Sequence, residues 1–157
     1  MYSREEIKQL HKEFWNGFDE FCSHLPRFKY RKKPWILYNT KIKGVELKFD
    51  ATREGAYVIF ELNHHNPNKK FAMMELMRKY KVVFDEYFDN AIWEDSFIKP
   101  CGTDVCRIYR RNPELNIHKR EQWKDFYVYL SKNMSMLEKA FDQLRELLEI
   151  IAEKNAV

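Results

Sequence analysis

The spacing of hydrophobic residues near the start of the chain predicts an amphipathic helix. Apolar side chains recur at steps of three and four from Ile7 to Leu25, which places them on one face of a helix. Ser3 and Glu6 precede this stripe at the spacing of a capping box, in which each side chain accepts a hydrogen bond from the other residue's main-chain amide. We expect the helix to end at Leu25, before Pro26.

Further along, the hydrophobic period changes to the alternation that is typical of half-buried strands. Residues 45–51 alternate apolar with polar side chains, and residues 56–62 are rich in β-branched and aromatic side chains. With a glycine between them, these two runs predict a β-hairpin. A second hairpin is predicted from residues 92–99 and 105–111, which flank the turn-forming segment 100–104.

Two more helices are predicted from apolar residues at helical spacing. One begins at Asn66-Pro67, an N-cap followed by proline at the first helical position, and is expected to run to about Phe88. The other fills the tail from about Glu121. A straight helix of that length would extend about 50 Å, so we expect a bend near residues 131–133.

These elements predict a single α+β domain over residues 1–157. Its mainly antiparallel sheet of four or five strands is expected to pack against an N-terminal helix, a middle helix and a long C-terminal helix, with residues 35–38 as the optional fifth strand. The chain has 157 residues and is 45% hydrophobic, which is enough material for a packed core.

The net charge, the first residues and the cysteines indicate which partners and which cellular location to expect. The net charge of +4 permits attraction to phosphate but lacks the imbalance of a dedicated nucleic-acid tail. The first residues are charged and no run approaches the ~20 apolar residues of a membrane span, so we expect no secretory signal and no membrane contact. Cys22, Cys101 and Cys106 are then expected to remain thiols in the cytoplasm.

Several short motifs resemble those of an uncharacterised bacterial family of domains of unknown function, over nearly the whole chain. They are Lys12-Glu13-Phe14-Trp15, Phe60-Glu61-Leu62, Ile92-Trp93-Glu94, Arg107-Ile108-Tyr109, and Trp123 at the start of the last helix. Domains of that family are found alone or fused to nuclease-like modules, so the resemblance implies a nucleic-acid or restriction-related context. It assigns no catalytic residues.

Lys48, Asp50 and Glu61 are the candidates for a catalytic site. If the apolar faces of the first hairpin align, we expect Lys48 opposite Glu61 and Asp50 diagonal to it. Restriction-nuclease-like enzymes hold a divalent metal with two carboxylates and stabilise charge with a lysine. In that motif the lysine lies two residues after the glutamate, where this chain has Asn63. We favour the alternative, an exposed cross-strand ion pair without catalytic activity.

A basic segment that includes aromatic residues favours contact with nucleic acid. Its candidate binding residues are Arg27, Lys29, Tyr30, Arg31, Lys32 and Lys33. The cations would contact phosphates and the ring would stack on an unpaired base. Arg107, Arg110 and Arg111 would extend the same surface. The alternative is a solvated loop.

The stripe on the C-terminal helix suggests a different kind of partner. Its members are Leu137, Phe141, Leu144, Leu148 and Ile151. Their spacing resembles a coiled-coil seam that would join two protomers or hold another protein. The alternative is that the stripe covers the sheet, and we favour this alternative.

Familiar cofactor and metal motifs are missing from the sequence. It contains no Gly-rich phosphate loop and no nucleophile motif. His64 and His65 are expected to point to opposite faces of a strand, so we predict no metal site and no cofactor, except a divalent metal under the nuclease alternative. The predicted function is a non-catalytic interaction domain acting near nucleic acid. A metal-dependent nuclease and a homo-oligomeric protein-binding module are the alternatives.

Overall fold

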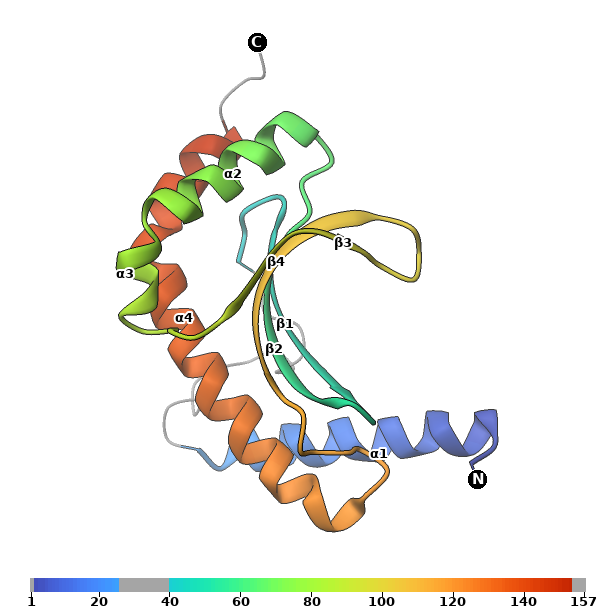
Figure 1. Cartoon of the computed structure of the whole chain (residues 1–157). Helices are drawn as coiled ribbons and strands as arrows, with labels where there is room; N and C mark the ends of the chain where they lie inside the picture. Colours follow the sequence, from blue (N-terminus) through green and yellow to red (C-terminus); the bar gives the residue numbers. More distant parts are fainter. Residues whose placement is uncertain (1, 26–39, 154–157) are drawn as a thin grey trace.

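The computed structural model describes residues 2–25 and 40–153, and it confirms the predicted α+β fold (Figure 1). In chain order the elements are α1 (Arg4–Ser23), β1 (Val45–Thr52), β2 (Gly55–Leu62), α2 (Pro67–Lys79), α3 (Lys81–Asp85), β3 (Ile92–Ile98), β4 (Asp104–Asn112) and α4 (Trp123–Glu153). A short 3-10 turn, Arg120–Gln122, leads into α4. The optional strand at residues 35–38 lies outside the described residues.

The four strands form one antiparallel sheet in the order β1-β2-β4-β3, so both predicted hairpins are present. The sheet is strongly curved, and α2, α3 and α4 lie on its convex side (Figure 1). The helix α1 crosses near the closed end of the β1–β2 hairpin (Figure 1). The concave face, called the open face below, is not covered by α2, α3 or α4.

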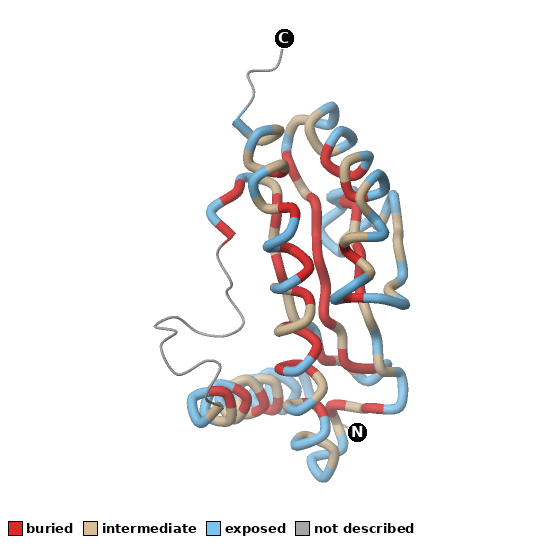
Figure 2. Tube along the Cα trace, turned by 90° about the vertical axis from the view of Figure 1, so that its left-hand side faces the viewer, coloured by how far each residue is buried: buried red, intermediate tan, exposed pale blue. Residues whose placement is uncertain are grey.

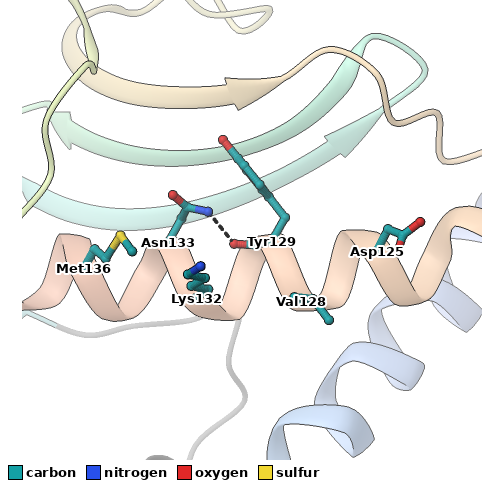
Figure 3. A pocket seen from close by; sticks show the side chains of 6 residues that line it. All are labelled: Asp125, Val128, Tyr129, Lys132, Asn133 and Met136. Atoms are coloured by element: carbon teal, nitrogen blue, oxygen red, sulfur yellow. Dashed lines mark hydrogen bonds between the residues drawn. The ribbon is translucent and has the colours of Figure 1, made fainter.

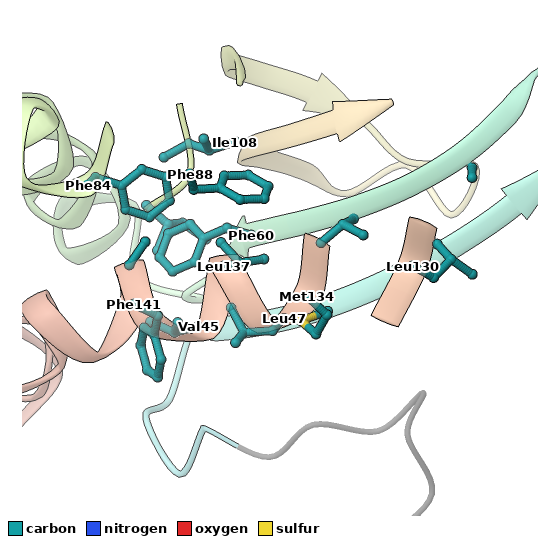
Figure 4. Close-up of a cluster of buried hydrophobic side chains, with 14 of the residues drawn as sticks. Val45, Leu47, Phe60, Phe84, Phe88, Ile108, Leu130, Met134, Leu137 and Phe141 are labelled. Carbon is teal, nitrogen blue, oxygen red and sulfur yellow. The ribbon is translucent and has the colours of Figure 1, made fainter. Parts of the chain in front are cut away.

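The hydrophobic core lies between the convex face of the sheet and the helices. Alternate residues of the strands point into it, and buried positions line both the strands and one side of α4 (Figure 2). Phe60, Leu137 and Phe141 meet at its centre (Figure 4). Because successive strand residues point to opposite faces, the charged residues between the core positions are directed to the open face.

The helix ends follow local capping signals, with two departures. The capping box is present: Ser3 N donates to Glu6 Oε1 at 3.2 Å, and Glu6 N donates to Ser3 Oγ at 3.1 Å. The helix α1 ends at Ser23, slightly before the predicted end. The middle helix does not continue to Phe88, because Tyr80 leaves the helical conformation at φ −105° and ψ 25°. This break redirects the chain into the short helix α3.

The helix α4 is continuous through residues 131–133, where a bend was expected. Ser131 Oγ and Asn133 Nδ2 donate to the carbonyls of Val128 and Tyr129 in the preceding turn, so these polar residues are accommodated without a break. The predicted apolar stripe is buried within the chain up to Leu148, as the alternative interpretation expected, and Ile151 at its end is partly exposed: Leu144 is 2% exposed and Leu148 is fully buried.

Candidate functional site

The open face carries charged and aromatic side chains in three rows that run across the strands. The first row is Glu46, Glu61, Arg107 and Glu94; the second is Lys48, Ile59, Tyr109 and Ile92; the third is Asp50, Tyr57 and Arg111. Neighbours in a row are direct cross-strand partners, whose side chains lie close enough to interact. The open face therefore places charged groups from all four strands next to one another.

Glu61 is the most buried carboxylate of the first row, with a side chain only 5% exposed. Its Oε2 accepts hydrogen bonds from Lys48 Nζ at 2.9 Å, Asn63 Nδ2 at 2.6 Å and Lys99 Nζ at 3.4 Å. Burial by itself would raise the pKa of Glu61, but the bonds from Lys48 and Asn63 outweigh it and hold the pKa below its usual range. Glu61 is thus ionised, and the neighbouring lysines already balance its negative charge.

The other two glutamates of this row are also paired with cations. Glu46 lies 3.2 Å from Lys48 Nζ. Glu94 Oε1 accepts from Arg107 Nε at 2.8 Å, and the guanidinium of Arg107 lies 3.4 Å from the ring centre of Phe97 and 4.3 Å from that of Tyr109. Such cation–π contacts restrict a guanidinium to one orientation. With Lys99, the cations balance the three carboxylates of the first row.

The predicted trio of Lys48, Asp50 and Glu61 does not assemble. The expected alignment of apolar faces is correct, since Val45 pairs with Leu62. That same register places Lys48 opposite Ile59, so Lys48 reaches Glu61 diagonally, and it places Asp50 opposite Tyr57. Asp50 and Glu61 therefore lie in different rows. The carboxylate beside Glu61 is Glu46, because those two residues are direct partners.

Asp50 differs from the glutamates in its surroundings. Its Oδ1 accepts from the amide of Ala51 at 2.9 Å. Although Asp50 is exposed to solvent, the protein atoms around it in the concavity raise the pKa of its carboxyl by desolvation, an effect that positive charge at His11 and Arg107 partly opposes. His11 belongs to α1, so this helix borders the open face at the third row.

A metal centre is not formed by the described residues. Across residues 2–25 and 40–153, no three His, Cys, Asp or Glu side chains converge on a point suited to a metal ion. A divalent ion at Glu61 would have to displace Lys48 and Lys99 from its carboxylate. Cys101 is exposed, whereas Cys106 is buried and donates to the carbonyl of Asp95 at 3.2 Å.

The three arginines predicted to share a basic surface are separated. Arg107 and Arg111 point to the open face, while Arg110 points to the opposite face. There Arg110 donates to Asn133 Oδ1 at 2.8 Å and to Asp89 Oδ1 at 2.7 Å. The alternation of side chains along a strand explains the separation. The other predicted nucleic-acid contacts, Arg27 to Lys33, lie outside the described residues.

Arg110 borders the second of two neighbouring hollows beside α4. A cavity of about 380 Å³ is lined by the residues drawn in Figure 3: Asp125, Val128, Tyr129, Lys132, Asn133 and Met136. A neighbouring cavity of about 270 Å³ shares Tyr129 and Asn133 and reaches Arg110. The polar groups of Arg110 and Asn133 are bonded to one another or to nearby residues, so they stabilise the contact between α4 and β4.

Lysine and histidine side chains gather where β2 leads into α2. The group consists of Lys43, His64, His65 and Lys69, called here the basic end. The rings of His64 and His65 stack with centroids 4.7 Å apart, and His64 Nδ1 accepts from the amide of Asn66 at 3.0 Å. Burial lowers the pKa of His64, and the positive charges of His65, Lys69 and Lys43 lower it further.

This stacking corrects the prediction that the two histidines point to opposite faces. The strand β2 ends at Leu62, so its alternation does not extend to His64 and His65. Gly44 lies directly against His64, because a Cβ at this glycine would come within 2.6 Å of the His64 Cβ. The glycine has φ +87°, a conformation that other residues rarely adopt.

Sequence reasoning missed most of the residues that complete these two surfaces. On the open face they are Glu46, Glu94, Lys99 and Tyr57, and at the basic end they are Lys43 and Lys69. The sequence does contain a signal for the basic end, since two histidines precede Asn66 and two lysines follow closely. For the open face, the partners come from strands that are distant in the chain, so no local motif identifies them.

The family model of the domain of unknown function DUF4268 matches residues 10–145, which is most of the chain. The chain belongs to the DUF4268 family. This confirms the expected membership in an uncharacterised family of domains of unknown function. No curated protein and no solved structure matches this DUF4268 chain. Among its described residues, no helix has both the length and the apolar character needed to cross a bilayer.

Proposed function

We propose that this DUF4268 domain is a non-catalytic interaction domain that contacts the phosphates of nucleic acid through its basic end. The observation that carries the proposal is the gathering of Lys43, His65 and Lys69 around the neutral ring of His64. The depressed pKa of His64, to which burial and then three of these charges contribute, supports the view that they act within electrostatic range of one another. Such a group attracts a polyanion.

Within the described residues, neither Lys69 of the basic end nor Lys70, which follows it in α2, forms an ion pair with a carboxylate. Lys69 Nζ donates to the carbonyl of Ala152 at 2.9 Å, and Lys70 Nζ donates to the carbonyl of Asp104 at 3.0 Å. A main-chain carbonyl positions a lysine without cancelling its charge. The N-terminus of α2, capped by Asn66, adds partial positive charge at the same place.

The predicted basic segment comes shortly before the basic end in the sequence. Residues 27–33 precede Thr40 in the sequence, and the chain from Thr40 passes Gly44, which lies against His64. We propose that Arg27, Lys29, Tyr30 and Arg31, with Lys32 and Lys33, contact the same nucleic acid. The expected association of such domains with nuclease-like modules agrees with this function. The balanced charges of the open face offer a polyanion no comparable attraction.

Binding of labelled single- and double-stranded oligonucleotides, measured by fluorescence anisotropy over a range of salt concentrations, tests the proposal. We expect affinity to fall with salt at a log-log slope of roughly one per phosphate contact. Neutralising Lys43, Lys69 and Lys70 together with glutamine should weaken binding and reduce this slope. Neutralising Lys29, Arg31, Lys32 and Lys33 should weaken binding as well.

The matched control replaces Lys8, Lys12 and Lys124 with glutamine. These lysines are exposed on α1 and at the start of α4, so the control removes the same charge from other surfaces. Equal losses in the control and basic-end variants would show a non-specific charge effect and contradict the assigned site. Absence of binding at low ionic strength would contradict the function. With Mg²⁺ or Mn²⁺ added, we expect the oligonucleotides to remain intact, and cleavage would support the nuclease alternative.

A further inference from the structure

A second surface, separate from the basic end, contains an exposed carboxylate that forms no ion pair with a cation of the described residues. Each glutamate of the first row on the open face lies within an ion-pair distance of a lysine or arginine. Asp50, in the third row, accepts one hydrogen bond from the neighbouring Ala51 amide. Within residues 2–25 and 40–153, Asp50 forms no ion pair with a Lys, Arg or His nitrogen.

The cross-strand partner of Asp50 supplies an aromatic surface beside this carboxylate. Tyr57 lies directly opposite Asp50, and directly opposite residues have Cβ atoms about 5 Å apart. The ring of Tyr57 is half-buried, and its centroid lies 6.1 Å from that of Tyr109. A carboxylate next to a ring attracts a lysine or arginine side chain by combining an ion pair with a cation–π contact.

Other ligand classes fit the open face less well. A polyanion would be repelled by Asp50 and would find no net positive charge in the first row, where cations balance the three glutamates. A divalent cation would find one uncommitted carboxylate, and the described residues contain no cluster of three metal-ligating groups. An apolar ligand would bury Asp50 further without compensating its charge. A polypeptide with a basic side chain satisfies Asp50 and also suits a broad face with fixed charges of both signs.

Three positive groups near Asp50 reduce its attraction for a cation. His11 on α1 and Arg107 on β4 both lower the pKa of its carboxyl. Arg111 on β4 has its guanidinium 5.7 Å from the ring centre of Tyr57. However, Arg107 is bonded to Glu94, and Arg111 donates twice to the carbonyl of Glu54, at 2.7 and 3.1 Å. Neither arginine is therefore bound to Asp50, and the site is expected to have modest affinity.

We propose that Asp50 and Tyr57 receive a lysine or arginine side chain of a protein partner that lies along the open face. This interaction uses a surface different from the one proposed for nucleic acid. The two proposals can therefore be tested independently. If both hold, one domain contacts nucleic acid and a protein at the same time.

An isotope-labelled full chain, titrated with the peptide Gly-Gly-Arg-Gly-Gly and followed by NMR, tests the proposal. We expect saturable shifts in the amides of residues 48–52 and 55–59 and a fall in the pKa of Asp50 toward its ordinary value. The same peptide with glutamine in place of arginine should bind at least about tenfold more weakly, the factor expected when one charge-assisted contact is lost.

Asp50→Asn should abolish the arginine-dependent shifts while leaving the fold intact, because asparagine can still accept the bond from the Ala51 amide. Arg111→Gln should strengthen binding by removing a competing charge. Asp19→Asn, on the exposed side of α1, is the control and should change nothing. An equal response to both peptides, or an undiminished response in Asp50→Asn, would overturn the proposal. Self-association that depends on Asp50, seen by sedimentation without a peptide response, would also overturn it in favour of a second copy of the chain.

Discussion

Replacing Leu144 with alanine removes three carbon atoms from the core beneath α4. Leu144 is 2% exposed, and its neighbours along the stripe, Phe141 and Leu148, are fully buried. At roughly 0.8 kcal/mol for each buried methylene, lost burial alone accounts for about 2 kcal/mol. Because fully packed neighbours can collapse only partly, the remaining cavity should bring the loss of unfolding free energy to about 3 kcal/mol.

The measurement is urea unfolding followed by circular dichroism at several protein concentrations, with Ile150→Ala as the control. Ile150 lies on the same helix but is 60% exposed, so its truncation should cost less than about 0.5 kcal/mol. If α4 is held only by its own chain, the unfolding midpoint of both variants and of the wild type will not depend on concentration. If α4 joins two protomers, the wild-type midpoint will rise with concentration.

A loss of unfolding free energy below about 1 kcal/mol for Leu144→Ala would refute the packing argument, since truncating a leucine in a closed core costs more than this. A midpoint that depends on concentration in the wild type but not in Leu144→Ala would show that the residue acts at an interface between protomers. Sedimentation of both proteins over the same concentration range would then identify the oligomer.

Three further outcomes are expected from single sites. Gly17→Ala should destabilise the domain by about 1–3 kcal/mol, because the new methyl would clash with the hydroxyl of Tyr127. In urea unfolding the same change should cost less in a Tyr127→Phe background, and an equal loss of stability would exclude the clash. Cys101 should react first with a thiol reagent such as DTNB, because the Thr103 hydroxyl lowers the pKa of its thiol while the other two cysteines are buried; simultaneous labelling of all three would argue otherwise. Glu61→Gln should lower the free energy of unfolding by about 1–3 kcal/mol at neutral pH. The folded pKa of Glu61 lies below the unfolded value of 4.5, so the stabilisation by its ionised carboxylate is present above pH 4.5 and is lost as the pH falls through the folded pKa. A difference in unfolding free energy between variant and wild type that persists in strong acid would contradict this origin.

The open-face ion pairs show why a catalytic assignment from residue types alone was insufficient. Lys48, Asp50 and Glu61 are all on this face, as the alternation along the hairpin predicts. Whether they converge depends on which residues pair across the strands, and the register separates Asp50 from Glu61. The third carboxylate, Glu94, comes from β3 and reaches the row through Arg107 on β4, a contact between segments that are distant in sequence.

The sequence by itself determined the local elements of this protein. The capping box at Ser3, the alternation in both hairpins and the apolar stripe of α4 each depend on residues a few positions apart, so short-range periodicity was enough to predict them. Only the tertiary structure decided the break at Tyr80, the stacking of His64 on His65, and the grouping of Glu46, Glu61 and Glu94. Those features follow from strand pairing and side-chain packing between distant segments, which set the positions of charged groups relative to one another and leave no local pattern in the chain.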